Sequence, residues 1–152
     1  MKLTSYSNYS MRVLMVAAAR GPQLTTVGDL AEAFDVSVPH LVKCVHQLGL
    51  WGYLETVRGN RGGFRLAKPP EAIGVGEIIR RTESGFAIVE CFDPKTNTCP
   101  LIAKCKLRPA LRRATEAFLA ALDELTLADI TTNGAELLKV LDLAGPPDCR
   151  AA

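Results

Sequence analysis

The chain has 152 residues, of which 48% are hydrophobic and 22% are charged, so it can bury a core and is not expected to be disordered. The net charge of +2 is unevenly distributed: residues 1–70 hold eight Lys/Arg against four Asp/Glu, whereas residues 71–152 hold ten against twelve. The basic excess therefore favours a nucleic-acid surface in the N-terminal half.

No signal-peptide pattern and no apolar run of membrane-spanning length is visible, so we expect a cytoplasmic protein without membrane contact. In that reducing compartment the five cysteines are not expected to form structural disulfides, and close cysteines more often indicate metal or redox chemistry. An enzyme is not expected. Both histidines lie in one predicted helix, and the sequence has neither a nucleotide-binding glycine loop nor a recognisable catalytic constellation.

The first 70 residues carry the pattern of a winged helix-turn-helix domain. Thr25 or Thr26 is suited to cap a second helix and Ser37 a third, and two short helices joined by a tight turn are typical of DNA-binding proteins. Strand-type residues then flank a glycine-rich turn, which predicts a two-stranded wing. In chain order the predicted elements are helices near 6–20, 27–35 and 38–49 and strands at 53–57 and 64–68.

The third predicted helix and the wing carry the candidate DNA contacts. The polar face of the helix, opposite an apolar face that includes Cys44, suits phosphates and base edges, although a solvated face explains that helix alone equally well. Three arginines crowd the wing turn, which a purely structural turn does not need, and this favours DNA binding. The candidate DNA contacts are Ser37, Pro39, His40, Lys43, Gln47, Arg58, Asn60, Arg61 and Arg65.

The C-terminal half is predicted to be helical, with one irregular segment. A short helix at 75–83 precedes residues 84–106, which lack periodicity and are called the cysteine loop below. The apolar stripe of a long helix at about 107–125 suits dimerisation, although packing within one chain is an open alternative. A weaker helical region at 127–144 completes a mainly α protein with three parts: 1–70 for DNA, 71–106 for the connecting helix and cluster site, and 107–152 for dimerisation. The stripe consists of Leu107, Leu111, Ala114, Phe118, Leu122 and Leu125.

Three cysteines lie within the polar cysteine loop. Seven residues separate Cys91 from Cys99, and five separate Cys99 from Cys105. Thiolates bind zinc, copper(I) or iron–sulfur clusters, and the paired close spacing of structural zinc sites is missing. Chemistry alone favours an iron–sulfur cluster and leaves zinc and a disulfide switch open. Cys44 is expected in the core, and Cys149, near the C-terminus, is a weak candidate.

The sequence resembles the Rrf2 family of winged-helix transcription regulators. The resemblance rests on the opening MKLTSYSNYSMRVL, the wing VRGNRGGFRLAKP, the helix VGEIIRRTE and the three cysteines before a long helix. Within the family, FAIVECFD and the cysteine spacing look most like the branch of the rhizobial iron regulator RirA, followed by that of the nitric-oxide sensor NsrR. The resemblance implies a homodimer on operator DNA, acting as a repressor, with Cys91, Cys99 and Cys105 holding a 4Fe-4S cluster; 2Fe-2S is the alternative or degradation form.

The resemblance leaves the fourth cluster ligand open. Arg108 stands where some members have a histidine ligand, and Asn8 stands where others have an aspartate from the partner subunit. Asn8, Asp93, Glu90 or a small exogenous molecule are the remaining candidates. The expected function is sensing of iron or cluster status; the alternatives are a nitric-oxide-sensing repressor with the same fold and a zinc or thiol redox-responsive regulator.

Overall fold

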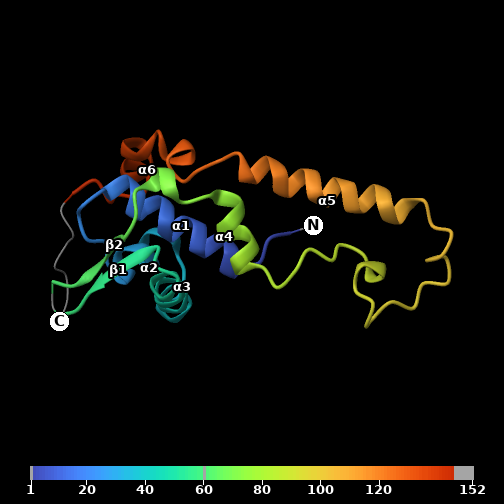
Figure 1. Ribbon diagram of the computed structural model, residues 1–152. Coiled ribbons are helices and arrows are strands. Elements are labelled where there is room, and N and C mark those ends of the chain that lie inside the picture. The colour runs from blue at the N-terminus through green and yellow to red at the C-terminus, as the bar shows by residue number, and fades with distance from the viewer. Residues whose placement is uncertain (1, 60, 146–152) are drawn as a thin grey trace.

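The computed structural model describes residues 2–59 and 61–145, so Asn60 and Cys149 lie outside the described residues. The chain is mainly helical with one two-stranded antiparallel sheet, as predicted (Figure 1). No helix in the described ranges is long and apolar enough to cross a membrane. The elements are α1 (Ser5–Arg20), α2 (Val27–Phe34), α3 (Val38–Leu50), β1 (Leu54–Val57), β2 (Gly63–Leu66), η1 (Pro70–Ala72), α4 (Val75–Thr82), η2 (Glu90–Phe92), α5 (Leu107–Asp123), η3 (Asp129–Thr131) and α6 (Gly134–Val140).

The helix-turn-helix unit is formed by α2 and α3. Thr26 is the N-cap of α2, and its hydroxyl and the Asp29 carboxylate form a reciprocal capping box. Asp35 ends α2 in the left-handed conformation. The predicted cap at Ser37 is half correct: Ser37 occupies the N-cap position of α3, but its hydroxyl makes no capping bond because it hydrogen-bonds the His40 ring instead.

The wing pairs β1 with β2 from Leu54 opposite Leu66 to Val57 opposite Gly63. Thr25, which lies before α2, exchanges two backbone hydrogen bonds of 2.9 Å with Phe64 and so attaches the wing to the helices. This approach requires glycine at position 63, since a Cβ there would lie 2.6 Å from the Thr25 carbonyl oxygen. The wing is therefore held at a defined place beside α2.

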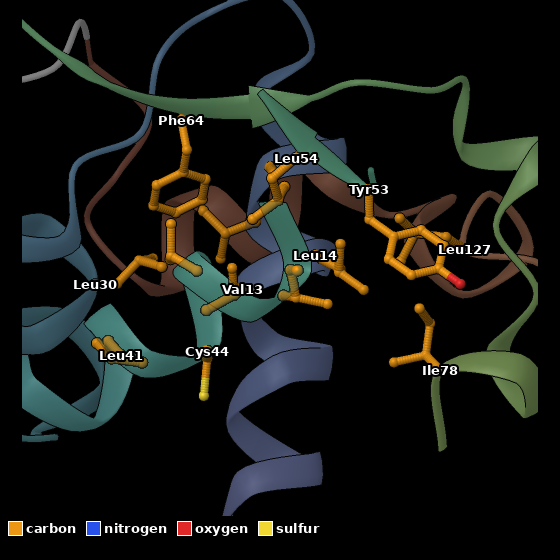
Figure 2. Packing of buried hydrophobic residues seen from close by; sticks show 14 of the residues in the cluster. Val13, Leu14, Leu30, Leu41, Cys44, Tyr53, Leu54, Phe64, Ile78 and Leu127 are labelled. Carbon is orange, nitrogen blue, oxygen red and sulfur yellow. The ribbon is translucent and has the colours of Figure 1, made fainter. Parts of the chain in front are cut away.

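One hydrophobic core unites α1, α3, the wing and α4. Leu14, Leu41 and Phe64 are fully or almost fully buried in it, and Figure 2 shows them among the buried side chains that different elements contribute to this core. Each such side chain contributes about 1.5–3 kcal/mol by leaving water. Cys44 is also in this core, as predicted, and burial raises the pKa of its thiol.

The cysteine loop and most of α5 project from this body as an arm (Figure 1). The chain leaves the body after α4 and returns along α5, where backbone bonds from Val75 to Leu125 and from Leu127 to Ile73 attach it. Arg80 of α4 pairs with Asp123 at the end of α5. α5 ends at Asp123, two residues before the predicted end of the long helix, so Leu125 lies outside the helix. α6 packs on α1.

Candidate nucleic-acid interface and metal centre

The solvent-facing side of α3 carries the helix residues predicted to contact DNA. His40 and Lys43 are exposed and Gln47 is half-buried, while the opposite side of the helix is in the core. Ser37 and Pro39 are exposed at the start of the helix. Residues spaced three or four apart share a helix face, so α3 presents these polar groups together.

Two tyrosines of α1 contact the polar side of α3, and sequence reasoning missed both. The Lys43 ammonium lies 5.9 Å from the centre of the Tyr6 ring, within cation–π range. The Tyr9 ring stacks on His40 with 6.3 Å between ring centres. The only sequence signal for these contacts is that the two aromatic residues lie three apart in the first helix. The orientation of two candidate DNA contacts therefore depends on α1.

The wing turn presents two exposed arginines, Arg58 and Arg61. Gly59 has a φ of +111°, which favours glycine, and a Cβ at Gly62 would overlap the Val57 carbonyl oxygen. The third arginine differs, because Arg65 donates from Nε and one terminal nitrogen to Glu55 across the strands, at 3.1 and 3.2 Å. The structure therefore leaves Arg58 and Arg61 extending from the turn and gives Arg65 a partner within the wing.

The cysteine loop brings the three predicted ligand cysteines into one segment. Cys91, Cys99 and Cys105 are free thiols, each half-buried. The backbone hydrogen bonds within the described loop join residues at most four apart, such as Phe92 to Val89 and Asn97 to Asp93, both at 3.1 Å. Such local bonds leave the loop able to rearrange around a bound group.

The cysteines do not form a preassembled site for a single ion. Among residues 2–59 and 61–145, no three His, Cys, Asp or Glu side chains lie close enough together to hold a metal ion. A tetrahedral zinc site needs sulfurs about 2.3 Å from one metal. An iron–sulfur cluster has several irons that each take a thiolate, so it accepts more widely separated cysteines. The donor set of three thiols is compatible with such a cluster.

The residues predicted as a fourth ligand lie in two different parts of the structure. Asn8 is exposed in the first turn of α1, on the body of the molecule. Asp93 is within the loop, where its carboxylate accepts a hydrogen bond of 2.9 Å from the Lys95 amide. Glu90 accepts a longer one of 3.4 Å from the Thr98 hydroxyl. The two acidic residues are thus near the thiols along the chain, and Asn8 is not.

Basic residues surround the end of the cysteine loop that enters α5. The first turn of α5 has no acidic residue, and Lys104, Lys106 and Arg108 are at or before it. The Arg112 guanidinium lies 5.5 Å from the centre of the ring of Phe92, the residue that follows Cys91. The positive end of the helix dipole lies at the same end of the loop as these cations. The electrostatics therefore suit a negatively charged thiolate-bound group.

The apolar stripe of α5 is largely uncovered within one chain. Leu107 is 62% exposed and Leu125 37% exposed, Ala114 is exposed, and Leu111 and its neighbours in the stripe are at most half-buried. Thr115 is the one buried residue of the helix. A stripe of this kind suits contact with another surface.

Glu83 joins the start of the cysteine loop to the start of α1, a connection that sequence reasoning missed. Its carboxylate accepts hydrogen bonds from the Ser7 hydroxyl at 2.5 Å and from the Thr4 amide at 2.7 Å and hydroxyl at 3.1 Å. Partial burial by itself raises the pKa of Glu83, but these bonds outweigh it and hold the pKa below its usual value. The loop is thereby attached to the helix that contacts α3.

Comparison with known proteins is consistent with this architecture. Residues 3–133 match the family described as Rrf2, iron-dependent transcriptional regulator. The chain is 44% identical to the HTH-type transcriptional regulator NsrR of Bacillus subtilis, covering 94% of this chain and 99% of that one, and 46% identical to the NsrR of Geobacillus kaustophilus, covering 93% and 97%. The solved structure of CymR, the global cysteine regulator of B. subtilis, matches with a TM-score of 0.69 and 27% identity, covering 88% and 98%.

These comparisons decide several of the expectations. The relatives carry the name NsrR, not RirA, so the expected closest resemblance to RirA is not supported. The expectations of a regulator and not an enzyme, and of a winged helix, are confirmed by the family match and by the likeness to CymR. The chain belongs to the Rrf2 family of transcription regulators.

Proposed function

We propose that this protein is a homodimeric, cytoplasmic DNA-binding repressor whose affinity for its operator depends on an iron–sulfur cluster held by Cys91, Cys99 and Cys105. One observation carries the cluster assignment: three half-buried thiols lie in a single loop between α4 and α5, beside cations and without an acidic residue in the first turn of α5. The iron-dependent description of the family and the relatives named NsrR support it.

In this proposal residues 1–70 bind DNA, with α3 in the major groove and the wing against the backbone or minor groove. His40, Lys43 and Gln47 of α3, with Ser37 and Pro39 at its start, face the DNA. Arg58 and Arg61 of the wing turn do so as well, and Arg65 supports the wing through Glu55. Asn60, the other wing residue predicted to contact DNA, lies outside the described residues. The uncovered stripe of α5 pairs with that of a second copy, because one winged helix recognises only a few base pairs and a dimer recognises two half-sites.

The proposed cluster is 4Fe-4S, with three thiolate ligands and a fourth position open to Asp93, to the partner's Asn8 or to a small molecule. When bound, the cluster supplies iron–thiolate bonds that join distant parts of the cysteine loop. The chain then transmits the loop's arrangement through two attachments. Glu83 connects the loop to α1, and α5 connects it to the dimer interface. Local ordering by metal binding thus changes the placement of the two DNA-reading units.

The test is anaerobic purification with iron and sulfide analysis, followed by operator binding of the cluster-loaded and cluster-free protein. We expect a visible chromophore and tighter operator binding by the loaded form. Cys99→Ser should lose both, and Cys44→Ser, as the matched control in the core, should keep the chromophore. A colourless protein with bound zinc, or equal operator binding by both forms, would contradict the proposal.

The physiological signal has a second candidate, nitric oxide, which the relatives named NsrR favour over iron. The two signals are separated by treating the loaded protein on its operator with an iron chelator or with nitric oxide. Release by nitric oxide at near-stoichiometric amounts, with slow release by the chelator, identifies a nitric-oxide sensor. The opposite order identifies a sensor of iron supply.

A further inference from the structure

Arg108 in the first turn of α5 has a buried N–H without a partner. The Nε atom is inaccessible to solvent and makes no hydrogen bond with any described residue, although the rest of the side chain is partly accessible. An unpartnered buried donor costs about 1–3 kcal/mol, so native proteins rarely retain one. The position of this group therefore calls for an acceptor that the chain can supply or hold there.

The surroundings of Arg108 point to the cysteines. Cys105 lies three residues before it, and helix side chains lean toward the N-terminus, which is the side of the cysteine loop. Arg112, one turn later, shares the face of Arg108 and stacks over Phe92, the neighbour of Cys91. Cys105, three residues before Arg108, and Phe92, the neighbour of Cys91, thus connect two of the three cysteines with this part of α5.

Neither acidic residue of the cysteine loop accepts a hydrogen bond from the Arg108 Nε–H. Asp93 accepts its hydrogen bond from the Lys95 amide, and Glu90 from the Thr98 hydroxyl. No ion pair of Arg108 occurs among the described residues, whereas Arg65, Arg80 and Arg81 each have one. The cysteine sulfurs are the other acceptors that the cysteine loop offers.

We propose that Arg108 is a positioning residue that donates its Nε–H to a sulfur of the cluster, and that this bond slows loss of the cluster. The inference rests on the proposed cluster and goes beyond it by assigning a role to a residue that is not a ligand. Arginine keeps its charge at all physiological pH values, and hydrogen bonds to the sulfurs tune such clusters. Arg108 thereby offsets the negative charge of three thiolates in a loop with few other fixed contacts.

The experiment compares Arg108→Gln with Arg113→Gln, which removes the same charge from an exposed position of the same helix. Resonance Raman spectra of the loaded proteins in H2O and D2O report N–H···S bonds through the Fe–S(Cys) stretching bands. We expect Arg108→Gln to lose part of the deuterium sensitivity and to lose its cluster to a chelator about tenfold faster, as for one charge-assisted hydrogen bond. Arg113→Gln should match the wild type in both measurements.

Arg108→Lys keeps the charge but has no Nε donor, so it should lose the cluster at a rate between those of the wild type and Arg108→Gln. Wild-type behaviour of both Arg108 variants would overturn the inference, and Arg108→Lys decides it if Arg108→Gln does not fold. If the wild type binds no iron–sulfur cluster, the proposed function fails and this inference fails with it. If the wild type binds one and Arg108→Gln equals Arg113→Gln, only this inference fails.

Discussion

Glu83 provides a sharp test of the attachment between the cysteine loop and α1. In Glu83→Ala the fully buried Ser7 hydroxyl loses its carboxylate acceptor and keeps only the Thr4 hydroxyl at 3.0 Å. The two bonds from Thr4 are exposed and contribute little. One partly buried hydrogen bond to a charged group gives a loss of about 2 kcal/mol in the free energy of unfolding. For a chain of this length that corresponds to a fall in Tm of about 4–8 °C.

The assay is urea unfolding at several pH values, with Glu83→Gln as a variant of similar shape and Glu32→Gln, exposed on α2, as the control. Because the folded-state pKa of Glu83 is lowered, its charge stabilises the fold above the unfolded-state pKa, and this contribution is lost as pH falls through the lowered folded value. The deficit of Glu83→Gln should therefore be full at pH 7 and shrink as the pH falls below 4.5, the ordinary pKa of a glutamate. A deficit that does not change with pH, or one no larger than that of Glu32→Gln, would refute the reasoning.

Three further expectations concern the wing and its support. Gly63→Ala should lower the unfolding free energy by about 2 kcal/mol through overlap with the neighbouring carbonyl, whereas Gly28→Ala, with ordinary contacts in α2, should be neutral or stabilising in the same urea titration. The Tyr53 hydroxyl donates to Glu77 at 2.5 Å, and burial is the main cause that raises the pKa of Tyr53 to about 12. In an ultraviolet titration one of the three tyrosines should ionise near that value, and this titration step should be missing in Tyr53→Phe. The stability that the bond provides should be lost as the pH rises from the unfolded-state pKa of 10 through the folded-state pKa. Arg61→Gln should weaken operator binding and reduce the slope of log affinity against log salt by about 1 without changing Tm, and an unchanged slope would contradict a phosphate contact.

Much of the local structure was predictable from the sequence. The periodicity of apolar residues predicts α1, α2 and α3, and Thr26 caps α2 as one of the two residues expected there. Strand-type residues around glycines predict the wing. These features depend on residues within a few positions of one another, so the sequence contains the whole signal.

Other features depend on residues that are distant in the sequence. No local pattern indicates that Tyr6 and Tyr9 contact Lys43 and His40 or that Thr25 pairs with the wing. The sequence also suggests three equivalent wing arginines, and only strand register reveals that one of them faces Glu55. In each case packing of separate elements, rather than the preference of any residue, decides the contact.

The site of the three cysteines combines features that the sequence predicts with features that only the tertiary structure reveals. The three thiols and their spacing are features of the sequence, and they are sufficient to predict thiolate chemistry, because chain proximity alone keeps them within one loop. The tertiary structure decided that this loop lies on an arm with an uncovered helix and that Glu83 attaches its start to α1. It also revealed the buried Nε of Arg108. Burial and long-range hydrogen bonds arise only when the chain has folded, so the sequence specifies the reactive groups and the fold specifies their surroundings.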